Sequence, residues 1–561
     1  MYMKKYIFLA ASALTLASCS SDDFLGDTPG STPTSANSAI KFDGNAGKIS
    51  RTSNSGTTAE MLGNEFKIYG VKSGATSGTD YTPVFQNYLL WYDNENKNTT
   101  TNKSGWEYVG TAGTHGSATL NSNQTIKFWD YASADYRFVA GAPSTAFNFT
   151  PGTNNTLESA TITGLSGHIT ANTESGTDPK TEPNPVYVAK PVVVSPGNDK
   201  QPVTFTFVRH QTKVRVGIYE TIPGYTITDI KFYDADGTTA TSSNIILTSA
   251  TANYFVGGSN VSGTVTYKWT TPTPSYTFNY TDNENLKKSK NWYAGKLESG
   301  ALATTSSEQE VAKLYGTDND MSTTGYFTVL PTQATTASPI LIKCDYTLTS
   351  DDGSNETIYI KGATAAIPAA YSKWNTNTLY TYLFKISENT NGYTGNDPNK
   401  TGLYPITFDA AVEAPQFGME GTITTFTTPS ITTHQEGSVV ENSGIKYVTN
   451  KNIKVTITDN TSGETKVLSK GGNAEGNVAV YKLSQERTEA DLQLASVSTE
   501  EIKSANSKDV TLATDNKSFT FLPDDAGYYA IQYLTTAAAE GKPEAYTYKV
   551  VKVVTPATTT E

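Results

Sequence analysis

The chain has few cysteines: its 561 residues contain two, Cys19 and Cys344, which lie more than three hundred positions apart. Two cysteines cannot build a framework of several disulfides, so the fold must be held by its cores. Cys344 alternates with Ile342 and Tyr346 in "LIKCDYTL". This pattern predicts that Cys344 is a small buried apolar residue on a strand.

Histidine is also scarce. No two histidines have the i, i+4 spacing of a zinc site, and none belongs to an H-E-x-x-H motif. His210, in "VRHQT", follows a strand pattern and is expected to be structural. The chain lacks a G-x-S-x-G elbow and a P-loop. "DADGT" (234–238) lacks the later acidic ligands of a calcium loop and is expected to be a turn. We therefore expect neither an enzyme nor a cofactor or metal. The four histidines are His115, His168, His210 and His434.

Charge is sparse and negative. Charged residues make up 17% of the chain and the net charge is −12. Nucleic-acid binding needs clustered Lys and Arg, so nucleic acid is not an expected partner. Beyond the N-terminus, no apolar run approaches the roughly 18 residues of a membrane-spanning helix. Tryptophans can stack on sugar rings or fill sandwich cores. The sequence leaves both roles open for Trp91, Trp106, Trp129 and Trp292.

The N-terminus carries an export pattern. Lys4 and Lys5 precede the apolar run 6–16, which is about the length of a signal-peptide core. The run ends Leu16-Ala17-Ser18-Cys19, which resembles the bacterial lipobox. The resemblance implies that Cys19 is acylated and becomes the first residue of a membrane-anchored protein. An ordinary signal peptide with a chance cysteine is the alternative. Residues 20–23, "SSDD", resemble the tag that sends lipoproteins of Bacteroidetes-type bacteria to the cell surface.

The rest of the chain has the composition of β-structure. It is rich in Thr, Ser, Gly, Asn and Tyr, with 34 tyrosines. Short alternating runs such as "FKIYGVKS" (66–73) are bounded by turn residues, which is typical of β-sandwiches. Val203, Phe205 and Phe207 alternate in the same way. The sequence therefore predicts an all-β fold, with polar segments at 20–38 and 388–402 acting as tether and linker.

The last third of the chain carries a motif of its own. "DAGYY" (525–529) resembles the D-x-G-x-Y tyrosine corner of immunoglobulin-like domains, with Asp525, Gly527 and Tyr529 at the motif positions. In that motif the tyrosine hydroxyl bonds to a nearby backbone group. Ile531 stands where antibody domains carry a cysteine. A chance turn is the alternative.

Several stretches in order, over about residues 15–410, resemble the fimbrillin family of Bacteroidales surface proteins. They are the lipobox, "IKFDGNAGKISRTS", "FKIYGV", "FWDYASADYRFVAGAP", "FVRHQTKVRVGIY", "YFTVLPTQ" and "WNTNTLYTYLFKISEN" followed by "LYPITFDA". The resemblance implies two tandem transthyretin-like β-sandwiches, to which an Ig-like domain is appended. The expected limits are a signal peptide at 1–18, a tether at 19–38, sandwiches at 39–200 and 201–388, a linker at 389–403 and the Ig-like domain at 404–561.

The resemblance also implies a mode of assembly. In fimbrillins that polymerise, a protease cuts after an arginine and removes the first strand, and a strand of another subunit refills the groove. Here the removed strand would contain Ile40 and Phe42, and the scissile bond would be Arg51–Thr52. An exposed loop that is never cut at Arg51 is the alternative. A donated strand would satisfy the open sheet edge and bury alternate side chains.

The C-terminal strand pattern leaves the position in a pilus open. "YTYKVVKVV" (546–554) is either a donor strand or the last strand of the third domain. The second possibility favours a tip, accessory or base subunit. We expect an outer-membrane surface protein of a fimbrium, whose partners are other pilus subunits, a surface receptor or glycan, and the membrane through its lipid. A non-polymerising glycan-binding surface lipoprotein is the alternative.

Overall fold

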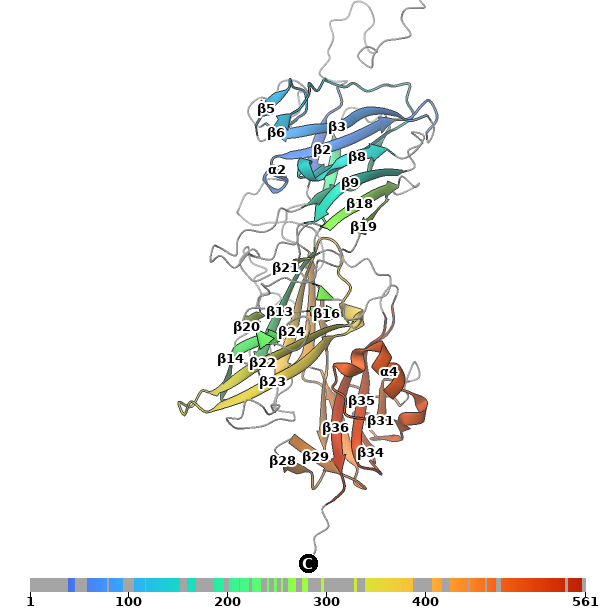
Figure 1. The fold of residues 1–561 in the computed structure, drawn as a ribbon. Helices are drawn as coiled ribbons and strands as arrows, with labels where there is room; N and C mark the ends of the chain where they lie inside the picture. Colours follow the sequence, from blue (N-terminus) through green and yellow to red (C-terminus); the bar gives the residue numbers. More distant parts are fainter. Residues whose placement is uncertain are drawn as a thin grey trace, which may run out of the picture. The chain divides into compact units, whose positions relative to one another are not determined.

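The fold is given by a computed structural model and consists mainly of strands (Figure 1), so the all-β prediction is confirmed. No helix among the described residues is long and apolar enough to cross a membrane. The structure describes residues 39–45, 58–77, 80–93, 105–116, 118–151, 159–167, 186–195, 201–210, 212–220, 224–233, 240–241, 247–249, 254–255, 261–268, 275–280, 294–296, 327–329, 339–386, 406–415, 424–441, 444–459, 462–470, 476–539 and 543–556.

The chain divides into two compact units. Unit 1 holds the described residues up to Gly167 together with those of 184–210 and 262–281, and unit 2 holds the others. The hairpin of β18 (Val261–Lys268) and β19 (Ser275–Tyr280) comes from the range predicted for the second sandwich, yet it belongs to a sheet of unit 1. Pairing between strands, rather than their order in the sequence, therefore sets the membership of a unit. The domain limits at residues 200, 388 and 403 stay predictions.

Unit 1 is built on two sheets. The larger has the order β1-β12-β10-β7-β2-β3-β4, with β11 beside β7, and the smaller has the order β19-β18-β9-β8. The strands are β1 (Phe42–Asn45), β2 (Glu65–Lys72), β3 (Thr82–Tyr92), β4 (Trp106–Glu107), β7 (Tyr136–Ala142), β8 (Asn148–Pro151), β9 (Ser159–Gly167), β10 (Tyr187–Ala189), β11 (Val192–Val194), β12 (Val203–Arg209), β18 (Val261–Lys268) and β19 (Ser275–Tyr280). A separate hairpin, a helical turn and a 3-10 turn complete the unit: β5 (Gly113–His115), β6 (Ala118–Leu120), α2 (Thr58–Met61) and η1 (Ser144–Ala146).

The first half of unit 2 also contains two sheets. Their orders are β20-β13-β24-β25-β26, with β21 beside β13, and β15-β14-β22-β16-β17, with β23 beside β22. The elements are β13 (Thr212–Glu220), β14 (Tyr225–Tyr233), β15 (Ala240–Thr241), β16 (Leu247–Ser249), β17 (Tyr254–Phe255), β20 (Ala294–Lys296), β21 (Phe327–Val329), β22 (Ile340–Ser350), β23 (Thr357–Ile367), β24 (Thr378–Ile386), β25 (Ile406–Pro415), β26 (Thr424–Thr427) and η5 (Ala369–Tyr371).

The second half of unit 2 has a four-stranded sheet, β27-β30-β34-β33, and a six-stranded sheet, β28-β29-β36-β35-β31-β32. A short helical segment lies between β31 and β32. The elements are β27 (Ser430–His434), β28 (Val439–Glu441), β29 (Gly444–Val448), β30 (Ile453–Thr458), β31 (Val478–Leu483), η6 (Asp491–Gln493), α4 (Ala495–Glu501), η7 (Ser504–Asn506), β32 (Ser507–Lys508), β33 (Val510–Leu512), β34 (Ser518–Phe521), β35 (Gly527–Thr536) and β36 (Ala545–Val554).

The strands with alternating apolar residues bury the faces that the sequence predicts. On β12, Val203, Phe205 and Phe207 are buried, whereas the threonines between them are exposed. On β22, Cys344 is fully buried between Ile342 and Tyr346, as a free thiol. Burial raises the pKa of the Cys344 thiol. The prediction that Cys344 is a small apolar core residue is therefore confirmed.

The tyrosine-corner residues lie at the start of β35. Tyr529 is fully buried, and its hydroxyl donates a hydrogen bond to the backbone carbonyl of Asp525 at 2.8 Å. Gly527 has φ 147°, a conformation that side chains rarely adopt. This hydrogen bond ties the backbone at Asp525, just before β35, to the buried side chain of Tyr529 on β35. It therefore helps to fix where β35 begins.

We predict that Tyr529→Phe weakens the C-terminal sandwich by about 1 kcal/mol, because only the hydroxyl and its hydrogen bond are lost. Tyr528→Phe, one position away on the other face of the strand, serves as the control and should cost less. Native-state hydrogen exchange of the β35 amides in the full chain measures both. Equal losses in the two variants would show that the Tyr529–Asp525 bond contributes nothing.

Candidate functional site

The first described segment, residues 39–45, closes one edge of the large sheet of unit 1. Its strand β1 pairs in parallel with β12, in a register that joins Phe42 to Val203 and continues for four positions. Just before β1, Ala39 forms an antiparallel bridge with Phe128. The segment therefore contacts the sheet edge on one side and residues 127–128 on the other.

Backbone hydrogen bonds hold this segment on both sides. The Ile40 amide donates to the Lys127 carbonyl at 2.8 Å, and the Val203 amide donates to the Lys41 carbonyl at 2.7 Å. The Tyr108 hydroxyl donates to the Ile40 carbonyl at 3.0 Å and accepts from the Lys127 amide at 3.1 Å. Burial raises the pKa of Tyr108, so its hydroxyl stays protonated and able to donate.

The side chains of the segment are part of the core. Ala39, Ile40 and Phe42 are each at most 1% exposed, whereas Lys41 and Asp43 between and beyond them are partly exposed. A strand with this alternation places its apolar face inward. Ile40 and Phe42, which the family resemblance predicts to lie on a removable strand, therefore fill part of the core.

Phe42 lies at the centre of an aromatic cluster. Its ring centroid is 5.1 Å from that of Phe85 and 5.5 Å from that of Phe138, both edge-on. The ring of Phe205 stacks nearly parallel to it at 5.9 Å, and that of Tyr108 lies edge-on at 5.8 Å. Such pairs add about 0.5–1.5 kcal/mol each beyond the burial of their area. Removing Phe42 would take a packing partner from four aromatic rings at once.

The other predicted site residues in the N-terminal region lie outside the described residues. These are the lipobox residues Leu16, Ala17 and Ser18, the anchor Cys19 and the processing pair Arg51 and Thr52. In the sequence, Arg51 follows Asn45, the last residue of β1, by six positions.

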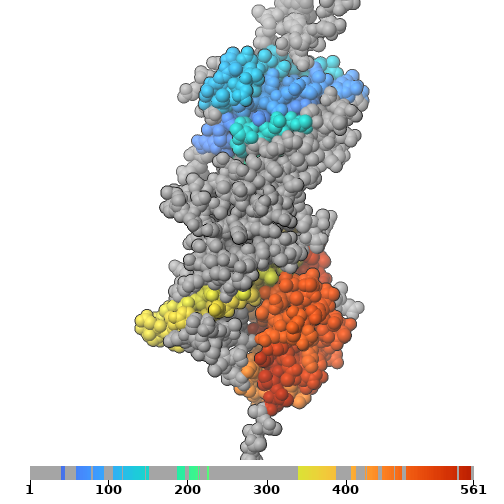
Figure 2. All heavy atoms as spheres, in the orientation of Figure 1, coloured from blue at the N-terminus to red at the C-terminus, as the bar shows by residue number. Residues whose placement is uncertain are grey.

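The C-terminal strand β36 has partners along both edges. It pairs antiparallel with β35, from Gly527↔Val553 to Thr536↔Ala545, and parallel with β29 at Lys446↔Lys552 and the next two positions. Val551 and Val553 are buried in the core of the C-terminal sandwich. Figure 2 shows the C-terminal residues, orange to red, as one closely packed mass. Residues 545–554 thus belong to this sandwich, which answers the question that the sequence left open.

Where the structure describes them, the tryptophans considered for sugar stacking are buried. Trp91, Trp106 and Trp129 are at most 3% exposed, so none presents a ring face to a sugar. His210 is buried, and burial lowers its pKa to about 3. His115 is partly exposed; its Nε2 lies 2.7 Å from the Thr111 carbonyl oxygen. Within the described part of the chain, no three His, Cys, Asp or Glu side chains group closely enough to hold a metal ion. Trp292, His168 and "DADGT" lie outside the described residues.

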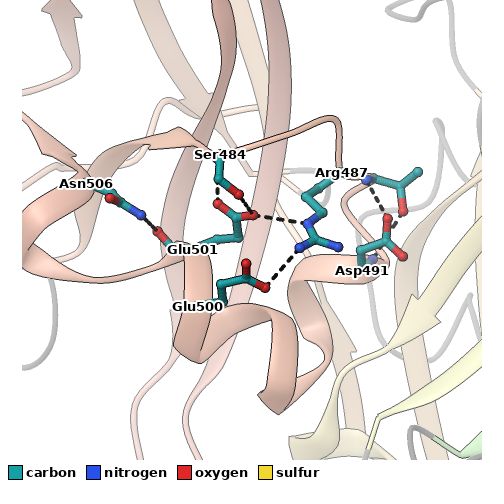
Figure 3. Close-up of polar contacts among 7 residues, drawn as sticks. Ser484, Arg487, Asp491, Glu500, Glu501 and Asn506 are labelled. Carbon is teal, nitrogen blue, oxygen red and sulfur yellow. Dashed lines mark hydrogen bonds and ion pairs between the residues drawn. The ribbon is translucent and has the colours of Figure 1, made fainter.

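A buried acid in the C-terminal sandwich was not anticipated from the sequence. Glu501 ends helix α4 with its side chain fully buried, and it accepts hydrogen bonds from the Ser484 amide and hydroxyl at 2.8 and 2.6 Å. Arg487 Nε reaches the same carboxylate at 3.1 Å, and its guanidinium also pairs with Glu500 at 3.0 Å (Figure 3). Asn506 donates to the Glu501 carbonyl. These bonds tie the end of α4 to Ser484 and Arg487, which follow β31 in the sequence.

The pKa of Glu501 follows from these contacts. Burial raises it, but the hydrogen bonds from Ser484 and the Arg487 charge outweigh burial, and the net pKa is lower than usual. A depressed pKa in the folded state contributes stability above the unfolded value, about 4.3, and this stability is lost as the pH falls through the folded value. The α4 segment should therefore loosen in acid.

We predict that Glu501→Gln costs about 1–3 kcal/mol of stability at pH 7, because Arg487 and Ser484 lose a charged acceptor. Glu500→Gln, at an exposed position, should cost under about 1 kcal/mol. Calorimetric unfolding of the full chain from pH 7 to pH 3 should show a smaller acid loss in the Glu501 variant than in the parent. Parallel pH curves for the two would contradict the assignment.

Phe42→Ala should weaken unit 1 by about 3–5 kcal/mol, because the truncation leaves a cavity among packed rings. Lys41→Ala, on the outward face of the same segment, should change stability by less than about 0.5 kcal/mol. Urea titration with hydrogen exchange read at the β7 and β12 amides measures both. Similar midpoints for the two variants would show that the ring does not support the core.

No family model matches the chain, and no curated protein matches it. Solved structures do. A fimbrial protein from Bacteroides vulgatus is 16% identical, with a match covering 66% of this chain and 99% of that protein at a TM-score of 0.34. A fimbrial assembly protein from Parabacteroides distasonis is 10% identical, with 69% and 98% covered at a TM-score of 0.24. These similar structures are Bacteroidales fimbrial proteins, the kind of protein that the sequence resembles.

Proposed function

We propose that the chain is a cell-surface lipoprotein that serves as a pilus subunit, at the tip or as an accessory subunit, joins its neighbour by strand exchange and mediates adhesion. The observation that carries this proposal is the segment 39–45. It fills the core of unit 1 with Ile40 and Phe42 while it holds an edge position in the sheet. An edge strand whose side chains complete a core is the element that another strand can replace.

The size of the segment favours replacement. The register of β1 covers four positions of β12, Val203 to Thr206, although β12 runs to Arg209. An incoming strand with a longer register than these four positions would add backbone hydrogen bonds worth about 0.5–1.5 kcal/mol each. The covalent link to unit 1 is what keeps β1 in place against such a competitor, because an intramolecular strand has a high effective concentration.

Cutting the chain would remove that advantage. We place the cut at Arg51–Thr52, in the polar stretch "GKISRTSNSG" that follows β1. After the cut, residues 39–45 and the acyl chains on Cys19 would be joined to each other but not to unit 1. Loss of the segment would then release the protein from the membrane and open the groove in one step.

The pairing of β36 supports an end position. A subunit within a stalk both accepts and donates a strand, and β36 is already committed to β35 and β29. Freeing it would break ten residues of ladder and expose Val551 and Val553. We therefore assign to this chain an acceptor groove in unit 1 and no donation from β36, which suits the end of a filament.

A glycan-binding surface lipoprotein that does not polymerise is the second candidate. The fully packed state of unit 1 supports it, since with β1 in place the described core is already filled. In that case the acylated Cys19 would persist and β1 would never leave.

The test is the N-terminus of the protein taken from the surface of its native cell. We predict that the parent chain starts at Thr52 and forms oligomers that resist SDS without heating. Arg51→Ala should retain an acylated Cys19 and remain monomeric, whereas Lys48→Ala, three positions away, should behave as the parent. An acylated Cys19 in the parent chain would overturn strand exchange and leave the second candidate.

A further inference from the structure

Unit 2 contains a cavity that the strand-exchange proposal does not use. Its volume is about 110 Å³. One side is formed by β23, β24 and β25, and the other by β36 and residues 489–493. Small-molecule sites are concave and are lined by apolar and aromatic side chains with a few polar groups.

The lining combines charged and polar groups of both kinds. The lining includes two acids, Asp409 and Glu489, two bases, Lys385 and Lys549, and the amide residue Gln493. Two acids and two bases balance in charge. The lining therefore brings together residue types that accept and residue types that donate hydrogen bonds.

The polar groups near residue 490 are held in place. The Glu489 carboxylate accepts from the Val550 amide at 3.0 Å, and the Gln493 amide donates to the Tyr546 carbonyl at 2.8 Å. Both bonds fix the loop to β36, and each leaves further hydrogen-bonding capacity on the same side chain. A ligand would meet these groups already oriented, which lowers the entropy cost of binding.

Aromatic residues form the apolar part of the lining. Phe408, Tyr546 and Tyr548 contribute to it, and Gln532 fixes the Tyr548 hydroxyl at 3.1 Å. Burial raises the pKa of Tyr548 to about 12, so its hydroxyl is neutral at pH 7. Aromatic residues beside fixed donors and acceptors are a combination that suits a ring with hydroxyl groups.

We propose that this cavity binds one neutral sugar residue of a glycan. Sugar hydroxyls donate and accept hydrogen bonds, and the C–H faces of the ring pack on aromatic side chains. An apolar ligand would bury the carboxylates and amide away from water without replacing their bonds, which costs free energy. The balance of charge favours a neutral ligand over an anion. The volume suits a single ring rather than a chain of several.

This inference names a ligand class for the adhesive role and is independent of strand exchange, because the cavity lies wholly within unit 2. Arg51→Ala, which blocks the proposed processing, should bind sugar as the parent does. Failure of strand exchange would therefore leave sugar binding intact, and failure of sugar binding would leave strand exchange intact.

The experiment is saturation-transfer NMR on the purified full chain. The probes are the methyl glycosides of glucose, galactose, mannose, fucose and N-acetylglucosamine. We predict transfer to at least one of them with a Kd in the millimolar range, and loss of transfer in Thr364→Trp, which places a large ring in the cavity. Thr357→Trp, on the same strand β23 but outside the lining, should bind as the parent does.

A second pair of variants covers the case in which Thr364→Trp does not fold. Lys385→Gln keeps the size of the side chain but removes one ammonium group from the lining, and it should weaken binding at least fivefold. Lys361→Gln, exposed on β23, should leave binding unchanged. Absence of transfer to all five probes, or transfer that persists in every cavity variant that folds, would overturn the proposal.

Discussion

The packing of Phe42 among four aromatic rings is the interaction on which the account of unit 1 depends. Phe85, Tyr108, Phe138 and Phe205 come from four parts of the chain and meet at this one ring. Within the described residues, the strand that carries Phe42 pairs with β12 at four register positions. A short segment at a sheet edge thus makes a large contribution to the core. The core needs its side chains, and its edge position is one that another strand could take.

The rest of the molecule is consistent with a protein held by cores and backbone ladders rather than by cross-links. Cys344 is a buried free thiol, and the network around Glu501 secures the one helical segment of the C-terminal sandwich in the described residues. β36 is an interior strand of its sheet, because it lies between β35 and β29. Stability in the C-terminal sandwich and exchange at β1 are therefore separate properties of the chain.

Much of the fold could be predicted from the sequence, wherever it depends on the pattern of neighbouring residues. Alternation on β12 and around Cys344 gave the correct buried faces, because a strand turns successive side chains to opposite sides. Glu501 and Arg487 were missed, since a buried ion pair depends on which loops meet. The stretch "TEADLQ" (488–493) did contain a recognisable helix-capping pattern. The Asp491 carboxylate accepts from the Thr488 amide, and the Thr488 hydroxyl accepts from the Asp491 amide. The β18–β19 hairpin was assigned by its place in the sequence, but pairing with β9 is a long-range choice that local patterns do not encode.

The most direct test of the central claim is whether residues 39–45 can be replaced after the chain is cut. The protein would be cleaved after Arg51 and mixed with a labelled peptide of residues 38–45, and native mass spectrometry would follow the exchange. We predict that the cut fragment stays bound at first and is then displaced by the peptide, but not by the same peptide carrying Phe42→Ala. A groove that accepts both peptides equally, or neither, would contradict the account.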